Sequence, residues 1–102
     1  MIFKFGMQID FDEEKDKINI KKHKYSLSCA ADIIYDLLLF QGQKVIFSDE
    51  YECNGEIRCK AMADYDGRIV FFVFTMRGDD MRLISFRDAG EKETEEFWKN
   101  VL

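Results

Sequence analysis

The 102-residue chain lacks proline, contains a single histidine and has no uninterrupted hydrophobic run long enough to cross a membrane. Charged residues also interrupt its first 17 positions, so the hydrophobic region typical of a signal peptide is missing there. Internal repeats and compositionally biased linkers are absent as well. We therefore expect one cytoplasmic domain, residues 1–102, with no membrane segment.

The cysteine content argues against a disulfide framework. Cys29, Cys53 and Cys59 are odd in number and form no Cys-x-x-Cys pair. Together with His23 they show no regular spacing of metal ligands, so a zinc site has little support. The expected state is reduced thiols, and no metal or cofactor is predicted.

Acidic residues outnumber basic ones, with 20 Asp and Glu against 15 Lys and Arg and a formal net charge of -5. This balance argues against a large nucleic-acid surface, because phosphate contacts require clustered Lys and Arg. Positive charge is nevertheless concentrated in KKHK, residues 21–24. Aromatic residues are plentiful, with 10 Phe, 4 Tyr and 1 Trp, and they supply enough apolar surface for a core.

The first part of the chain predicts an extended segment followed by two helices. Residues 1–11 are expected to be a strand or an extended entry, and Asp12 can cap a helix with acidic residues at its start and basic residues at its end. Ser26 or Ser28 can cap a second helix, which Gly42 is expected to end. The apolar positions of the second helix recur at helical spacing: Ala30, Ile33, Ile34, Leu37 and Leu38.

The remainder of the chain predicts β-strands and a closing helix. Strands are expected at residues 44–47, 56–63, 68–76 and 81–87, with turns at 66–67 and 77–80. Ile57, Cys59 and Ala61 alternate with charged residues, so one face of that strand should be buried. The continuous apolar run at 68–76 predicts a central strand covered on both faces. The closing helix presents its apolar residues at helical spacing: Phe97, Trp98, Val101 and Leu102.

These elements predict a single small α+β domain, with an antiparallel β-sheet packed with N-terminal helices and a C-terminal helix. Arginines that lie on or beside its strands include Arg58, Arg77, Arg82 and Arg87. Guanidinium groups suit bidentate phosphate binding, although strand arginines are more often solvated surface groups. Simple alternation places Arg82 and Arg87 on opposite faces unless a bulge or the strand end intervenes.

Three segments form a more specific pattern. Residues 10–36 have an acidic start, a helix with Asn19, a Lys22-His23 pair and an Ala-Ala helix. Residues 55–89, GEIRCKAMADYDGRIVFFVFTMRGDDMRLISFRDA, contain Glu-x-Arg, Asp-Gly-Arg, Arg-Gly and Arg-x-Ile-Ser-x-Arg in that order. Glu93 follows, with an aromatic residue soon after it. This arrangement resembles the BrnT family of type II toxin-antitoxin ribonucleases, small proteins with a RelE-like fold.

The resemblance implies a metal-independent endoribonuclease that cleaves mRNA and inhibits translation, by helping a 2′-hydroxyl attack the adjacent phosphate. The implied phosphate-binding and transition-state-stabilising residues are Arg58, Arg77 and Arg82. Arg87 would add an RNA contact, and Lys22 would contribute positive charge. Either His23 or Glu56 would carry the proton.

The implied partners are an RNA substrate and a cognate BrnA-type antitoxin. Such an antitoxin binds DNA, so this chain would contact DNA only indirectly. Some positions depart from the family pattern: Cys59 replaces an aromatic residue, Ala63 replaces a glycine, and acidic residues dominate between the last strand and the final helix. A non-catalytic protein-interaction module of the same fold is therefore the alternative.

Overall fold

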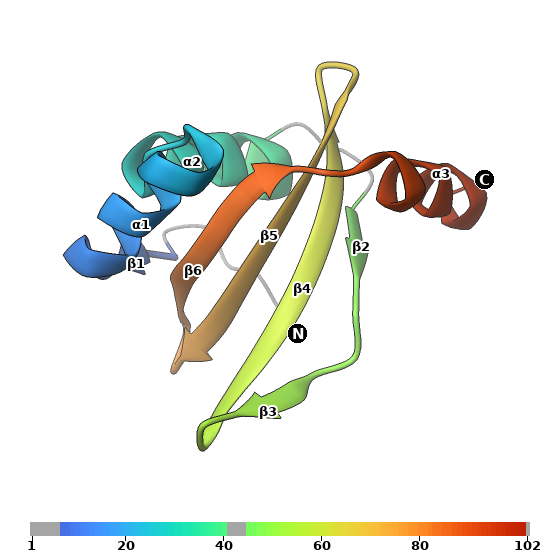
Figure 1. The fold of residues 1–102 in the computed structure, drawn as a ribbon. Coiled ribbons are helices and arrows are strands. Elements are labelled where there is room, and N and C mark those ends of the chain that lie inside the picture. The colour runs from blue at the N-terminus through green and yellow to red at the C-terminus, as the bar shows by residue number, and fades with distance from the viewer. Residues whose placement is uncertain (1–6, 41–44, 102) are drawn as a thin grey trace.

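The computed structural model describes residues 7–40 and 45–101, which form helices packed on a β-sheet (Figure 1). The strands are β1 (Ile9–Phe11), β2 (Val45–Phe47), β3 (Tyr51–Cys53), β4 (Glu56–Tyr65), β5 (Arg68–Arg77) and β6 (Asp80–Asp88). The α-helices are α1 (Glu13–His23), α2 (Leu27–Tyr35) and α3 (Glu91–Asn100), and the π-helix η1 (Asp36–Phe40) continues α2. The predicted α+β class is confirmed.

The sheet has the strand order β1-β6-β5-β4-β2, and β3 pairs separately with the start of β4. All pairs are antiparallel except β1 with β6, which is parallel. The sheet is therefore mixed rather than wholly antiparallel. The turn between β4 and β5 is the predicted Asp66-Gly67, whose φ angles of 52° and 87° suit a tight hairpin.

The helix starts follow from local capping chemistry. Asp12 accepts a hydrogen bond from the backbone N–H of Glu14, as predicted, and basic residues occupy the last turn of α1. Ser26, rather than Ser28, caps α2 by accepting from the N–H of Cys29. Gly42 and Leu102 lie outside the described residues.

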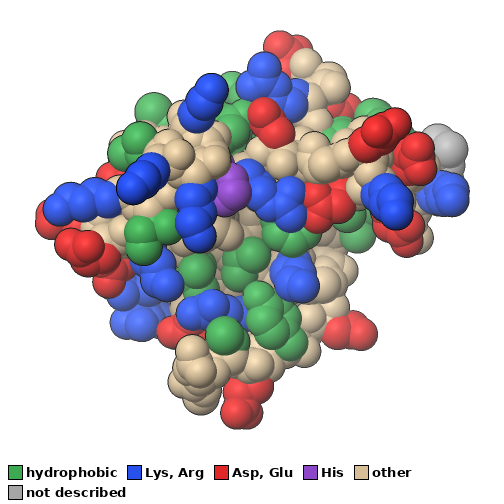
Figure 2. All heavy atoms as spheres, viewed as in Figure 1, with side chains coloured by type: hydrophobic (Ala, Val, Ile, Leu, Met, Phe, Trp, Pro, Cys, Tyr) green, Lys and Arg blue, Asp and Glu red, His purple; other side chains and the backbone are tan. Residues whose placement is uncertain are grey.

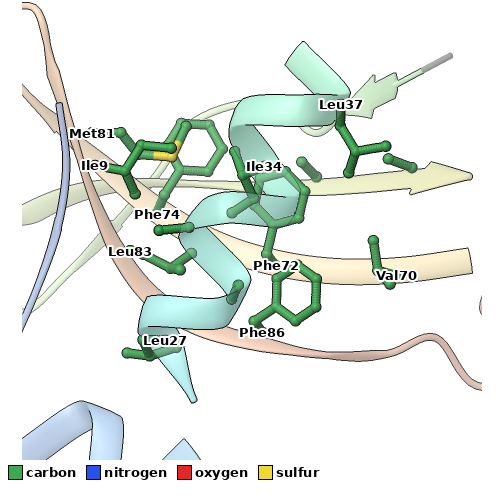
Figure 3. Close-up of a cluster of buried hydrophobic side chains, with 14 of the residues drawn as sticks. Ile9, Leu27, Ile34, Leu37, Val70, Phe72, Phe74, Met81, Leu83 and Phe86 are labelled. Carbon is green, nitrogen blue, oxygen red and sulfur yellow. The ribbon is translucent and has the colours of Figure 1, made fainter. Parts of the chain in front are cut away.

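The core lies between α2 with η1 and one face of the sheet (Figure 3). Leu27, Ile34 and Leu37 come from the helical side and are essentially inaccessible to solvent. The sheet side supplies Val70, Phe72, Phe74, Met81, Leu83 and Phe86. Stacking of Phe72 on Phe86, with ring centroids 5.9 Å apart, joins β5 to β6 within this layer.

Two packing predictions require correction. β5 is central, but its cover on the face away from α2 is incomplete, since Phe71 and Val73 there remain partly accessible. Ile57 is 50% exposed because it lies near the end of β4, although Cys59 and Ala61 are buried as predicted. Trp98 is 42% exposed, while its neighbour Phe97 is fully buried and anchors α3.

Candidate functional site

The sheet face opposite α2, here called the open face, carries the charged residues of the central strands. On β4, Cys59 and Ala61 point into the core, so Arg58 and Lys60 point the other way. Figure 2 shows this side of the molecule, where blue Lys and Arg side chains lie among green hydrophobic ones. Alternation along the strands therefore separates an apolar face from a cationic one.

A β-bulge in β6 brings two arginines to this face. Val73 pairs with Ser85 while Phe74 pairs with Leu83, so Ile84 is an extra residue in β6. Arg82 then lies opposite Thr75, and Arg87 lies opposite Phe71. Directly opposed residues in an antiparallel pair share a face, so both arginines lie on the open face. The bulge overrides the alternation that would separate them.

Arg82 and Arg58 lie on either side of Thr75 in one row across three strands. Arg58 is one residue beyond the Cys59–Phe74 pair, which places it beside Thr75. The Thr75 hydroxyl donates to the carbonyl of Ile57 at 2.6 Å, and Thr75 is only 5% exposed. Two strand spacings, about 10 Å, separate the outer backbones of the row, so two long guanidinium side chains can reach one phosphate between them.

Glu56 joins two of the predicted arginines. One carboxylate oxygen accepts from Arg58 Nε at 3.1 Å, and the other lies 3.7 Å from Arg77 Nη2. The side chain of Arg58 is 21% exposed, whereas that of Arg77 is 59% exposed. The carboxylate therefore contacts both guanidiniums, the half-buried one of Arg58 by a hydrogen bond and the more exposed one of Arg77 by an ion pair.

Arg82 differs from the other arginines of the sheet. Arg58 and Arg77 contact Glu56, Arg68 contacts Asp88, and Arg87 contacts Glu93. Within residues 7–40 and 45–101, no carboxylate pairs with the half-buried Arg82. Asp10 lies opposite Arg82 in the β1–β6 pair but forms no ion pair with it, so no described carboxylate holds this guanidinium.

Arg87 instead fixes the last helix. Its two terminal nitrogens donate to both oxygens of Glu93 at 2.7 and 2.8 Å, and its guanidinium lies 4.2 Å from the centre of the Phe71 ring. The same carboxylate accepts from the N–H of Gly90 at 2.8 Å, at the start of α3. Hydrogen bonding from Arg87 lowers the pKa of Glu93 to about 2. Arg87 thus lies on the open face but is engaged with α3.

Lys22 and His23 lie at the edge of β6. The buried Asn19 on α1 donates to the carbonyl of Phe86 at 2.8 Å and accepts from its N–H at 3.0 Å, which holds α1 beside β6. Lys22 and His23 line a hollow of about 270 Å³ together with Ser85 and Ile84 of the bulge. The described part of the chain offers the His23 ring no hydrogen bond or ion pair.

The predicted site residues thus form three groups. Glu56, Arg58 and Arg77 are joined by ion pairs, and Arg82 shares the row of Arg58. Lys22 and His23 approach β6 from α1, and Arg87 pairs with Glu93. Thr75, Ser85 and Tyr51 are neighbours of these groups that were not predicted from the sequence. Strand alternation could have placed Thr75 on the face of Arg77, but Tyr51 belongs to β3, which was not predicted.

Other chemistry receives little support from the described residues. None of the groups of three or more His, Cys, Asp and Glu side chains within residues 7–40 and 45–101 is arranged to hold a metal ion. No helix among the described residues is long and apolar enough to cross a membrane. Cys59, at a position that departs from the expected aromatic residue, is buried, and burial raises the pKa of its thiol.

The fold and the open face define a small α+β domain in which α2 and η1 cover one side of a mixed sheet and arginines cross the other, where α3 is also held. The model of the family described as ribonuclease toxin, BrnT, of type II toxin-antitoxin system matches residues 11–93. The chain therefore belongs to the BrnT family of ribonuclease toxins, which confirms the resemblance seen in its motifs.

A solved structure supports the same assignment. The crystal structure of the Brucella abortus ribonuclease toxin BrnT is similar to this chain with a TM-score of 0.59 and 26% sequence identity. The similarity covers 83% of this chain and 99% of the Brucella protein. No match was found among curated proteins.

Proposed function

We propose that this BrnT-family toxin cleaves mRNA in the cytoplasm without a metal ion, with the RNA backbone lying across the open face. The observation that carries this proposal is the row formed by Arg82, Thr75 and Arg58, in which Arg82 has no described carboxylate partner. Such a row supplies two cationic groups to a phosphate, while the overall negative charge of the chain limits binding elsewhere.

The proposed reaction begins when the 2′-oxygen attacks the adjacent phosphorus. A new bond forms between the 2′-oxygen and phosphorus, and the bond from phosphorus to the 5′-oxygen breaks. The 2′-hydroxyl proton passes to a base, and the leaving 5′-oxygen receives a proton. The products are a 2′,3′-cyclic phosphate and a 5′-hydroxyl, and extra negative charge develops on the phosphate oxygens during the step.

The arginines would stabilise this charge. Arg82 and Arg58 contact the phosphate from two sides. Arg77, the last residue of β5, adds positive charge at that end of the open face. Glu56 orients Arg58, because a carboxylate that bridges two guanidiniums fixes their positions before the substrate arrives. Arg87 contributes chiefly by holding α3 beside the face.

We assign proton transfer to His23 in preference to Glu56. Both oxygens of Glu56 face guanidiniums, whereas the His23 ring lies in the hollow beside Ser85. Histidine can take and return a proton near neutral pH. Lys22, adjacent in the same hollow, would draw the RNA backbone toward this edge of the sheet.

The test is growth and total-RNA integrity after induction of this chain alone, beside an Arg58→Ala, Arg82→Ala double variant shown to be folded. Arg68→Ala is a matched control, because Arg68 lies beyond the open face and pairs with Asp88. We expect growth arrest and RNA loss with the wild type and the control, but not with the double variant.

Cleavage in vitro completes the test. Purified protein in excess EDTA should still produce fragments that end in a 2′,3′-cyclic phosphate. If folded wild-type protein leaves growth and RNA intact, the catalytic proposal fails and the non-catalytic interaction module of the same fold is favoured.

We further propose that the cognate antitoxin is of the BrnA type, binds this chain, blocks its activity and provides the only contact with DNA. Co-expression with the protein encoded beside it should restore growth and give a stable complex. In a gel-shift assay with operon DNA, the complex and the antitoxin should bind, and this chain alone should not.

A further inference from the structure

Tyr51 extends the row of arginines at its outer end. In the β3–β4 pair Tyr51 lies directly opposite Arg58, so both side chains share the open face. The row therefore runs Arg82, Thr75, Arg58, Tyr51 across four strands. Tyr51 is only partly exposed.

The ring of Tyr51 already accepts a cationic group. The Lys60 ammonium lies 5.1 Å from the ring centroid, within the range of a cation–π contact. Lys60 is exposed and lies two residues from Arg58 on the same face. An exposed cation–π contact is worth little, about 0.5–1 kcal/mol, so Lys60 can leave the ring when a better-stacking group arrives.

We propose that Tyr51 is a nucleobase-stacking subsite next to the phosphate-binding arginines. A base flanking the bound phosphate stacks on the Tyr51 ring, and Lys60 turns to the neighbouring phosphate. This inference rests on the proposed function, since it places one unpaired nucleotide of the same RNA. Aromatic side chains on sheets recognise single-stranded RNA in this way, because unstacked bases offer their faces to a ring.

The chemistry of stacking sets the substrate class. Every base has an aromatic face, so the subsite favours unpaired RNA over paired RNA without demanding one sequence. Bases inside a duplex are already stacked and cannot reach Tyr51. The subsite would therefore direct the toxin to single-stranded segments.

The experiment measures binding of two non-cleavable RNA probes by fluorescence anisotropy. One probe is a 2′-O-methyl oligouridine, and the other has the same backbone without bases. Tyr51→Leu should weaken binding of the base-bearing probe about 5- to 150-fold, the range expected for loss of one stacked base, and leave the abasic probe unchanged. Tyr51→Phe should bind both probes as the wild type does.

Lys60→Met provides the matched comparison, because it keeps the apolar stem and removes the charge. It should weaken binding of both probes equally, as expected for a phosphate contact. Thermal unfolding of each variant confirms that it is folded.

The outcomes separate the two proposals. If Tyr51→Leu weakens both probes equally, or neither, the stacking subsite is wrong while the ribonuclease proposal stands. If the wild type binds neither probe and cleaves no RNA, both proposals fail. Selective loss on the base-bearing probe, restored by Tyr51→Phe, supports the subsite.

Discussion

Arg82 and Arg87 point to the same face of the sheet although they are five positions apart in one strand. The extra residue Ile84 causes this arrangement by shifting the pairing of β6 with β5 between them. Their environments nevertheless differ, since Arg87 forms two hydrogen bonds with Glu93 and Arg82 has no carboxylate partner among the described residues. Arg87 is thus engaged in holding α3, whereas no described carboxylate holds Arg82.

Substitution of Arg82 should affect RNA binding, whereas substitution of Arg87 should affect the stability of the fold. Arg82→Ala should change the free energy of unfolding by less than about 0.5 kcal/mol but lower the salt slope of single-stranded RNA binding by about 0.7. Arg87→Ala should destabilise the fold by about 1–2 kcal/mol, because Glu93 loses its partner. Urea unfolding and RNA titrations at several salt concentrations measure both quantities. An unchanged salt slope for Arg82→Ala would contradict the assigned phosphate contact.

The Glu93 carboxylate should make stability depend on acid pH. Its pKa is about 2 in the folded chain against an ordinary value of 4.5, so the ionised form favours folding. This stabilisation is complete above the ordinary pKa and is lost as pH falls toward the folded value. Glu93→Gln should therefore cost about 1–2 kcal/mol at pH 7, allowing for solvent screening, and much less near pH 2.5.

Urea unfolding at both pH values checks this expectation. Glu91→Gln is the matched control, since it neutralises an exposed carboxylate in the same turn of α3. An equal cost of Glu93→Gln at pH 7 and pH 2.5 would show that the charge of Glu93 is unimportant.

The proton carrier can be identified from pH–rate profiles of RNA cleavage. His23→Ala should lower the rate about 10²–10⁴-fold and remove the limb of the pH–rate profile that proton transfer by His23 produces. Glu56→Gln should lower the rate about tenfold by loosening Arg58 and Arg77, with the shape of the profile retained. The reverse result, a lost limb only in Glu56→Gln, would assign the proton to Glu56.

Asn19 should be essential for stability. Its side-chain amide makes hydrogen bonds with the N–H and C=O of Phe86 and with the carbonyl of Tyr25, and it is 2% exposed. Asn19→Ala leaves these buried groups without partners and should cost about 2–3 kcal/mol in urea unfolding. Ile20→Ala, at an exposed neighbouring position, should cost less than about 0.5 kcal/mol. Similar costs for the two variants would refute this role of Asn19.

Local signals in the sequence predicted much of the fold. The Asp12 cap, the acidic and basic ends of α1, the Asp66-Gly67 turn and the long strands all depend on neighbouring residues. Non-local features were missed. The parallel pairing of β1 with β6 joins segments about 70 residues apart, and β3 has only three residues, too few for a periodic pattern.

The candidate site was predictable as a set of residues but not as an arrangement. Arg58, Arg77, Arg82 and Arg87 were identified from the sequence, yet the common face of Arg82 and Arg87 depends on the bulge at Ile84, which no local sequence pattern indicates. The pairing of Arg87 with Glu93 depends on where α3 begins, and the contact of Lys60 with Tyr51 depends on β3. Register, rather than composition, decides which of these charges meet.

The amide of Asn19 also acts as a substitute for a missing strand. β1 covers only the beginning of β6, from Met81 to Leu83, and beyond it Asn19 gives and accepts the two hydrogen bonds that a neighbouring strand would make with Phe86. Exposed strand edges invite pairing between molecules and aggregation. Because Asn19 occupies the N–H and C=O of Phe86, neither group is free to pair with a strand of another molecule at this position.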